Sequence, residues 1–417
     1  MNTVSEDRLR EDIEANAEFG AIDATSGRGR TVLTGSEANR LAREQFVSRL
    51  IDAGLDVAVD RVGNIAGTWT PPSADPNAAP VATGSHLDSV PEGGIFDGPL
   101  GVYAGLEAIR AMQDANFEPT RPVTVVSFTE EEGSRFGSGL LGSSVATGKR
   151  GVEEALLLRD DDGLTLREAL AAMDFIGDGE IDARQWNAWL ELHVEQDTTL
   201  ESEGVAVGVV STITGIAHYE ATVTGEANHA GATPMNQRRD ALAAATEVVG
   251  DVERAAQEVT VTDSPTAVAT VGSLEVEPNA TNVVPGRAKL GIDVRDVRRD
   301  TMDGLADRIE KSLARVGSTR PVETTLSKSI DVDPTPMSDR CQAAVREAGE
   351  SLGISTMDMP SGAAHDTMHV ATVTDAGLLF APSRDGISHN PMEWTDWEDC
   401  ARATRVLAWA LALLASQ

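Results

Sequence analysis

The chain reads VATGSHLDSVPEGGIFDGPLGVYAGLEAIRAMQDANFEPTRPVTVVSFT from residue 81 to residue 129. Two short runs rich in β-branched residues, 81–86 and 122–129, flank a helical pattern at 99–115. A strand, a helix and a second strand at this spacing predict a βαβ unit in a parallel sheet that helices cover on both faces. Because ligands gather at the carboxyl ends of such strands, we expect functional residues in the glycine-rich segment 84–101, which begins where the first strand ends.

A second pattern begins near residue 212. The segment GIAHYEATVTGEA alternates, MNQRRDALAAATEVVGDVERAAQ is helical, TAVATVGSLEV and RAKLGIDVRDV alternate again, and DGLADRIEKSLARVG is helical. This β-α-β-β-α order predicts a small α+β domain inserted into a larger α/β domain. We therefore expect a larger domain made of residues 1–212 and 331–417 and an inserted domain made of residues 213–330.

The 417 residues include 67 acidic and 34 basic side chains, which gives a formal net charge of −33. A field of this sign repels phosphate backbones and anionic membranes, so neither a nucleic acid nor a membrane is expected as a partner. The excess of acidic residues is spread along the chain, among alanine and glycine, rather than gathered in a tail. It favours a surface adapted to high salt, where screening removes the self-repulsion, and a halophilic source is therefore a hypothesis.

The chain has two cysteines, Cys341 and Cys400, which are too few for a disulfide framework and are expected to be core thiols in a reducing compartment. The first residues, MNTVSEDRLREDIE, are acidic where a secretory signal would be basic and then apolar. The most apolar run, VLAWALALLA at 406–415, is shorter than a membrane span and is expected to pack on the core. These features predict a cytoplasmic protein.

The glycine-rich segment carries His86, Asp88 and Asp97. Glycine lets the backbone fold tightly around a site that His86 and Asp97 share. Asp88 lies close enough in sequence to accept the other ring N–H of His86 and fix its tautomer, as carboxylates behind metal-binding histidines do. The alternative is that both aspartates only form turns beside glycine, which the FDG sequence suits. We interpret His86 and Asp97 as metal ligands.

Three carboxylates follow the second apolar run in SFTEEEGSRF, at Glu130, Glu131 and Glu132. A charge run is usually a solvated face, but this one directly follows a strand of the buried type and has no neighbouring lysine. A metal cation would relieve the repulsion if one glutamate bound it while another, with a raised pKa, served as a general base. The residues alone do not select among the three.

Two further histidines lie where predicted strands end, His193 in WLELHVEQD and His389 in SRDGISHNPMEWT. Together with His86, Asp97 and one glutamate they provide three imidazoles and two carboxylates. This donor set suits two divalent ions bridged by the aspartate, with zinc expected first and manganese, cobalt or nickel as alternatives. Two ions that share one water generate a nucleophile at neutral pH, so we expect metal-assisted hydrolysis of an amide-like bond.

The predicted inserted domain contributes His229, Asn282 and Arg295, which are hydrogen-bond donors without metal-ligand spacing. Arg295 can simply pair with Asp293 or Asp296. Alternatively, the three residues hold an anionic substrate and its transition state, because Arg binds a carboxylate bidentately and His or Asn donates to a developing oxyanion.

Seven motifs occur in a fixed order over most of the chain: GSHLDSVPEGGIFDGPLG, FTEEEGSRF, ELHVEQ, NHAGATPM, NATNVVPG, SGAAHD and GISHNPMEW. In combination they closely resemble the hydantoinase/carbamoylase family of amidases, within the dinuclear-metal superfamily of aminoacylases and carboxypeptidases. The resemblance implies a metal-dependent exopeptidase-like α/β domain with a mixed, mainly parallel sheet between helices and an inserted α+β lid and dimerisation domain. Among family members, the motifs are most similar to those of N-carbamoyl-L-amino-acid hydrolases, with allantoate amidohydrolases and β-ureidopropionases as siblings.

The resemblance also implies individual roles. One ion would be held by His86, Asp97 and His193, and the other by Asp97, Glu132 and His389, so that Asp97 bridges them. Glu131 would be the general base. The implied substrate contacts are Gln196, His229, Asn282 and Arg295, with the inserted domain forming a homodimer, lending residues to the partner's active site and closing over the substrate about hinges near 212 and 330.

The chain departs from the family pattern at Asp197, where glycine usually follows HVEQ, and at Ala364 in SGAAHD, where glycine is usual. The first departure bears on the orientation of Gln196 and the second on the loop expected to face the substrate carboxylate. Substrate choice is the inference that they affect most. The alternatives are the same chemistry on allantoate or ureidopropionate, an aminoacylase or aminopeptidase, and a non-catalytic binding protein that has kept the fold.

Overall fold

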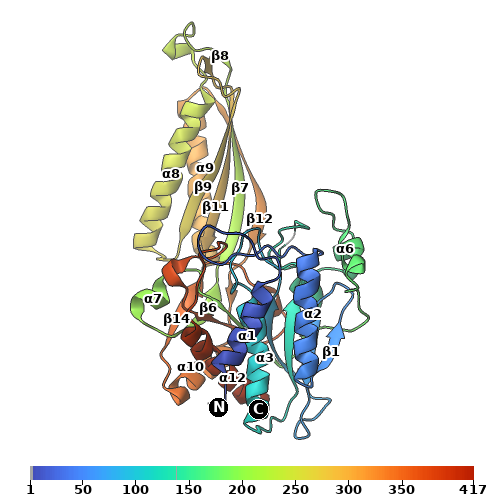
Figure 1. The fold of residues 1–417 in the computed structure, drawn as a ribbon. Helices are drawn as coiled ribbons and strands as arrows, with labels where there is room; N and C mark the ends of the chain where they lie inside the picture. Colours follow the sequence, from blue (N-terminus) through green and yellow to red (C-terminus); the bar gives the residue numbers. More distant parts are fainter. Residues whose placement is uncertain (1–2, 138) are drawn as a thin grey trace. The chain divides into compact units, whose positions relative to one another are not determined.

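The computed structural model describes residues 3–137 and 139–417, and the chain forms two compact units. The larger unit comprises residues 1–211 and 336–417, and the inserted unit comprises residues 212–335 (Figure 1). The inserted unit extends to residue 335, beyond the expected 330, because its last long strand, β12 (Glu323–Val332), runs past that position.

The larger unit is built on a nine-stranded sheet: eight strands form one continuous order, the ninth pairs beside it, and the four central strands are parallel. The order is β1-β2-β4-β3-β5-β15-β6-β13, with β14 paired to β6. Pairing is parallel for β4 with β3, β3 with β5 and β5 with β15, and antiparallel for β1 with β2, β2 with β4 and β15 with β6. The strands are β1 (Asp56–Val59), β2 (Ile65–Trp69), β3 (Val81–His86), β4 (Val123–Phe128), β5 (Ala188–Val194), β6 (Val207–Ile213), β13 (Thr335–Pro336), β14 (Thr356–Ser361) and β15 (Ala376–Ala381).

Helices cover both faces of this sheet. Every residue of β3, β4, β5 and β15 is buried, as expected for strands between two helical layers. Val81, Val125 and Leu190 face one core cluster, whereas Ala82 and Val126 face another, because successive side chains of a strand point to opposite faces. The mixed α/β architecture and its parallel centre confirm the predicted fold class.

The helices of the larger unit begin with regular caps where the sequence supplies them. Ser5 and Ser36 accept hydrogen bonds from Arg8 N and Asn39 N at the starts of the first two helices. The α-helices are α1 (Glu6–Ala17), α2 (Glu37–Asp52), α3 (Pro99–Asp114), α4 (Leu141–Ala146), α5 (Val152–Leu156), α6 (Leu166–Ala172), α7 (Thr199–Glu203), α10 (Asp339–Leu352), α11 (Thr367–Val370) and α12 (Trp397–Ala415), with 3-10 turns η1 (Ala183–Gln185) and η3 (Arg384–Gly386).

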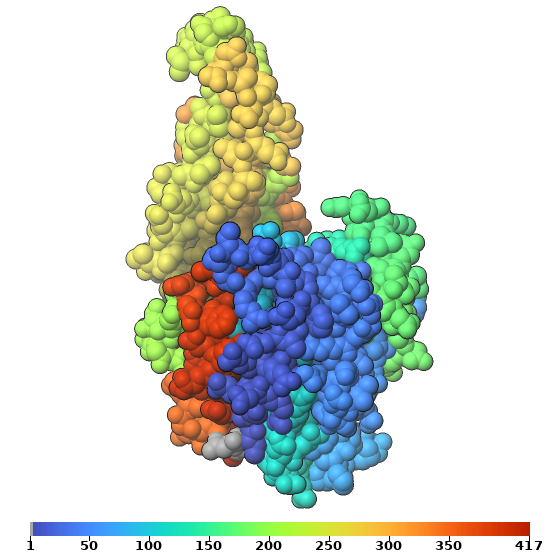
Figure 2. Space-filling view, viewed as in Figure 1, coloured from blue at the N-terminus to red at the C-terminus, as the bar shows by residue number. Residues whose placement is uncertain are grey.

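The N-terminal and C-terminal segments meet in the larger unit. Helix α1 packs against α3 and α12, and Arg28 N donates to the Pro391 carbonyl over 2.7 Å. Figure 2 shows these blue and red segments side by side on the surface of the larger unit. No helix among residues 3–137 and 139–417 is long and apolar enough to cross a membrane.

The inserted unit is an antiparallel sheet packed on two long helices. The strand order is β12-β7-β11-β9, and α8 and α9 pack on it around a separate core (Figure 1). A short pair, β8 with β10, lies beyond one end of the long strands. The elements are β7 (Gly215–Thr224), β8 (Asn228–His229), η2 (Met235–Gln237), α8 (Ala241–Thr262), β9 (Val268–Glu277), β10 (Val283–Val284), β11 (Arg287–Asp296), α9 (Arg299–Thr319) and β12.

Candidate metal centre

The expected ligands lie at the carboxyl ends of the parallel strands. His86 is the last residue of β3, the glutamate run follows β4, and His193 is near the end of β5. His389 lies in the loop between β15 and α12. Parallel strands end at one edge of a sheet, so four segments that are far apart in sequence supply side chains to a single place.

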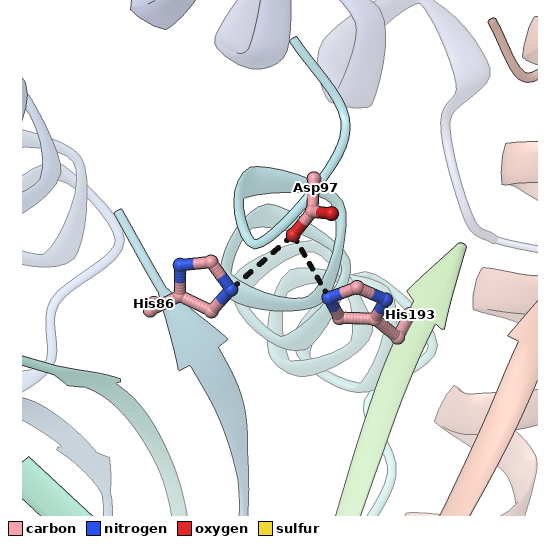
Figure 3. Close-up of side chains that lie close together, drawn as sticks. All are labelled: His86, Asp97 and His193. Atoms are coloured by element: carbon pink, nitrogen blue, oxygen red, sulfur yellow. Dashed lines mark ion pairs between the residues drawn. The ribbon is translucent and has the colours of Figure 1, made fainter. Parts of the chain in front are cut away.

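Asp97 occupies the centre of this place. Its Oδ1 atom lies 3.4 Å from His86 Nε2 and 3.2 Å from His193 Nε2 (Figure 3). Its Oδ2 atom lies 3.5 Å from His389 Nε2, which is itself 3.5 Å from Glu132 Oε2. Each carboxylate oxygen therefore faces a different histidine group, which is the arrangement required of a bridging ligand.

Two groups of potential ligand atoms thus share Asp97. His86, Asp97 and His193 form one group and Asp97, Glu132 and His389 the other, with the atoms of each group within 4.8 Å of one another. Their nitrogen and oxygen donors are of the type that zinc and related divalent ions bind. His86 Nε2 is buried and has no hydrogen-bond partner among the described residues, as expected of an atom whose lone pair binds a cation. The donor set therefore fits divalent metal ions.

The imidazole rings of His86 and His193 are oriented by backbone carbonyls. Nδ1 of His86 lies 3.1 Å from the Asp88 carbonyl oxygen, and Nδ1 of His193 lies 3.0 Å from the Val194 carbonyl oxygen. A carbonyl only accepts hydrogen bonds, so we assign the proton to Nδ1 in both rings. Each Nε2 then presents a lone pair toward Asp97, where an ion would lie.

Asp88 supports the site in a different way from the one expected. Its carboxylate is 3.8 Å from His86 Nδ1, so the hydrogen bond to the ring comes from its backbone carbonyl. The carboxylate instead accepts from the backbone N–H groups of Glu131 and Glu132, over 3.3 and 3.2 Å. Asp88 therefore orients His86 through its main chain and the glutamate run through its side chain.

A glycine lets Asp97 approach His86. Gly98, the N-cap residue just before α3, has φ of 83°, a conformation that favours glycine. A Cβ atom at this position would lie 2.6 Å from the His86 ring. The FDG sequence is thus both a turn and the close contact that places Asp97 beside the end of β3.

The structure distinguishes the three adjacent glutamates. Glu130 turns away and accepts the N–H groups of Arg135 and Phe136, over 2.8 and 2.7 Å, so it holds its own loop. Glu132 belongs to the group with His389, and Glu131 Oε2 lies 3.7 Å from His86 Nε2. The side chains that face the candidate centre are therefore those of Glu131 and Glu132.

Burial governs the protonation of these two carboxylates. It raises the pKa of Glu131 well above its usual range, with His86 opposing the shift and Glu132 adding to it. Burial also raises the pKa of Glu132 to about 8, with Asp97 adding to it. A divalent cation would favour the ionised form of its ligand, whereas a carboxylate beside the ions that kept a raised pKa would suit a general base.

Gln196 contacts the shared carboxylate directly. It adopts φ of 59°, and its Nε2 donates to Asp97 Oδ2 over 2.9 Å and to Ser388 Oγ over 3.2 Å. The adjacent Asp197 is exposed, and its carboxylate accepts from Thr198 N and Thr199 Oγ1. The Asp197 carboxylate is thus bonded to the two residues that follow it, and the Gln196 side chain still points to the candidate centre.

The three expected substrate residues of the inserted unit are not together. His229 in β8 pairs with Val283 in β10, and Ala230 N donates to the Asn282 carbonyl over 2.9 Å, so His229 and Asn282 are neighbours. Arg295 lies near the opposite end of β11, about 27 Å away along a strand that rises about 3.4 Å per residue. Arg295 also forms the expected ion pair with Asp293, at 2.9 Å.

Four buried or half-buried residues beside the centre received no role from the sequence. The ring of His365 lies edge-on to that of His193, with centroids 4.6 Å apart, and burial raises the pKa of Asp366 to about 8. The SGAAHD motif was the only signal for this pair. Ser388 and Glu393 lie in the GISHNPMEW motif, but nothing in that motif indicated that they contact Asp97 and its backbone, some 290 residues away in sequence.

Comparisons with known proteins find relatives over most of the chain. The model of the Peptidase family M20/M25/M40 matches residues 82–412. An N-carbamoyl-L-amino-acid amidohydrolase of Paenarthrobacter aurescens is 37% identical over 406 residues, which cover 96% of each chain. A ureidoglycolate hydrolase of Arabidopsis thaliana is 36% identical over 383 residues, covering 89% of this chain and 79% of the relative. The crystal structure of an amidase of the hydantoinase/carbamoylase family from Burkholderia multivorans has a TM-score of 0.92 and 37% identity, covering 100% of this chain and 99% of that one.

Proposed function

The chain belongs to the Peptidase family M20/M25/M40, and on that premise we propose that it removes the carbamoyl group from N-carbamoyl-L-amino acids to give the L-amino acid, carbon dioxide and ammonia. The observation that carries the chemistry is the pair of ligand groups that share Asp97, with Glu131 beside them. The choice of substrate is supported by the carbamoyl-amino-acid relative and by the hydantoinase/carbamoylase amidase. Similarity to that amidase confirms the resemblance inferred from the motifs.

We propose that His86, Asp97 and His193 hold one divalent ion and that Asp97, Glu132 and His389 hold the other. Zinc suits the donor set best, and manganese, cobalt or nickel would also fit. When bound, the ions would polarise the ureido carbonyl and lower the pKa of the attacking water. Glu131 takes the proton from that water and returns it to the leaving nitrogen.

The remaining proposed contacts hold the substrate. Arg295 pairs with the substrate carboxylate and gives up its ion pair with Asp293 to do so. Gln196, beside Asp97, donates a hydrogen bond to the ureido group. His229 and Asn282 donate to the developing oxyanion. Because these two residues lie at the opposite end of the inserted unit from Arg295, we propose a homodimer in which each active site uses His229 and Asn282 of the partner subunit.

The homodimer can be tested by mixing two inactive variants. Glu131→Gln and His229→Ala should each be inactive as pure proteins. After unfolding and refolding together in equal amounts, about a quarter of the wild-type rate should return, because half of the dimers are mixed and each mixed dimer has one intact site. The absence of any recovery, with mixed dimers present by native mass spectrometry, would contradict the sharing of residues between subunits.

A second candidate substrate is another ureido acid, supported by the 36% identity to the ureidoglycolate hydrolase. Allantoate and β-ureidopropionate also carry a ureido group and a carboxylate. The deciding experiment is a panel of N-carbamoyl-L-amino acids, their D-enantiomers, these three ureido acids and N-acetyl amino acids, assayed with metal-reconstituted protein in high salt. Activity confined to a different ureido acid, or to the acetyl compounds, would overturn the proposed substrate.

We also propose that the protein acts in the cytoplasm of a halophilic cell. The support is the net charge of −33, with only four lysines, and the two buried free cysteines. Raising the KCl concentration from low to molar values should raise the thermal midpoint and the activity, because screening weakens the repulsion among surface carboxylates. The measurement is a thermal melt and a rate at each salt concentration. Full stability and activity in salt-free buffer would argue against halophilic adaptation.

A further inference from the structure

A buried glutamate joins the loop of Asp97 to the loop of His389. Glu393 is 1% exposed and lies between β15 and α12. Its Oε1 atom accepts the backbone N–H groups of Phe96, over 2.9 Å, and of Asp97, over 3.0 Å. Its Oε2 atom accepts from Ser388 Oγ over 2.9 Å. One carboxylate therefore fixes the main chain at Asp97 and the side chain next to His389.

The same connection reaches the side chain of Asp97. Ser388 Oγ lies 2.7 Å from Asp97 Oδ2, the oxygen that faces His389. The hydroxyl has a single proton, so it donates to Asp97 or to Glu393 at any moment, but it lies against both. Ser388 thereby ties the carboxylate proposed as the bridging ligand to the loop that supplies the last ligand.

The surroundings of Glu393 are shaped to receive it. A Cβ atom added at Gly94 would lie 2.2 Å from Glu393 Oε1, so this glycine leaves room for the carboxylate. The Phe96 ring packs against those of Trp394 and Trp397, with centroids 5.4 and 5.1 Å apart. Among the described residues, Glu393 forms no ion pair with an arginine or a lysine, and its carboxylate accepts hydrogen bonds from these two loops.

His389 needs such support more than the other ligands do. His86 and His193 are fixed at the ends of buried strands, but the side chain of His389 is 50% exposed and its backbone has φ of 54°, in a loop without regular structure. Asp97 and His389 are also 292 residues apart. A ligand group assembled from two loops has the geometry of an ion site only if the loops keep a fixed separation.

We propose that Glu393 is a positioning residue that, through Ser388 and the backbone of Phe96 and Asp97, assembles the ion site formed by Asp97, Glu132 and His389. It touches neither ion nor substrate. The inference rests on the dinuclear centre of the proposed function. It predicts that loss of Glu393 weakens the binding of the ion at Asp97, Glu132 and His389, called the second ion below. Binding of the first ion, at His86, Asp97 and His193, should not change.

The experiment measures ion binding rather than turnover. Chelator-treated wild type and variants are titrated with Co²⁺, and the bound ions are followed by visible absorption and counted by plasma mass spectrometry. Wild type should bind two ions. Glu393→Ala should bind the first ion with wild-type affinity and the second at least about tenfold more weakly, the scale expected when a residue that orients ligands is lost.

Two further variants test the geometry independently. Gly94→Ala keeps the Glu393 carboxylate but displaces it, and should lower the affinity for the second ion as Glu393→Ala does. Glu393→Gln keeps an oxygen that can accept from both backbone N–H groups, and should recover most of the second-ion affinity. The matched control is Glu398→Ala, because Glu398 is an exposed glutamate near the start of α12 whose carboxylate pairs with Arg402; both ions should bind as in wild type.

The outcomes separate this inference from the proposed function. If wild type binds two ions while Glu393→Ala and Gly94→Ala, folded by circular dichroism, bind both with wild-type affinity, the positioning role is wrong even if the enzyme hydrolyses carbamoyl amino acids. If Glu393→Ala does not fold, Gly94→Ala decides the question alone. Selective loss of the second ion in a protein inactive on every ureido acid would retain the positioning role and overturn the substrate.

Discussion

Glu131→Gln is expected to lower kcat by about 10²–10⁴-fold while the protein keeps its fold and both ions. Glutamine has the same shape but cannot accept and return a proton. The ligands proposed for the ions, His86 and Glu132 among them, are untouched by the substitution. The measurements are the initial rate of ammonia release from an N-carbamoyl-L-amino acid at saturation and the metal content per chain.

The control for this substitution is Glu92→Gln. Glu92 is exposed in the segment between Asp88 and Asp97, so the variant removes the same charge from a nearby position without changing the centre. It should keep wild-type rates. A Glu131→Gln enzyme with near-normal kcat would show that another group moves the proton, and the assignment of the general base would be wrong.

Asp97→Asn is expected to have the largest effect on ion binding. Asparagine has one carbonyl oxygen and one NH₂ group, so it can offer a ligand atom to one ion but not to both. The group drawn in Figure 3, with His86 and His193, and the group with Glu132 and His389 would then no longer share a ligand. We expect at least one ion to bind more than about 100-fold more weakly, beyond the range found for residues that only orient ligands, with activity falling below detection.

The measurement for Asp97→Asn is metal content after dialysis, together with the rate at rising metal concentration. The matched control is Asp385→Asn, an exposed aspartate in the loop that also carries His389. It should retain two ions. Two tightly bound ions in Asp97→Asn would exclude a bridging role for this carboxylate.

The sequence predicted those parts of the site that follow from strand ends. His86, the glutamate run and His193 come directly after or within apolar runs, and parallel strands bring such ends together. The inserted domain could also be predicted, because its alternating and helical segments follow one another in a β-α-β-β-α order typical of a small sheet packed on two helices. Local spacing was enough for both inferences.

The contacts between distant loops could not be predicted from the sequence. Asp88 was expected to orient His86 with its carboxylate, but the backbone carbonyl is nearer and the carboxylate bonds to the N–H groups of the glutamate run instead. The GISHNPMEW motif contains Glu393 but did not predict its role, because its hydrogen bonds reach Phe96 and Asp97 across almost 300 residues. Spacing along a chain does not state which backbone groups meet when distant loops fold against each other.

The most direct test of a dinuclear carbamoyl hydrolase is to titrate chelator-treated protein with a divalent ion while measuring ammonia release from N-carbamoyl-L-alanine. We predict little activity without added ion, full activity only as the second equivalent per chain binds, and equal amounts of ammonia and L-alanine as products. Full activity in the continuous presence of chelator, or no ammonia from any N-carbamoyl-L-amino acid after two ions have bound, would contradict the proposed function.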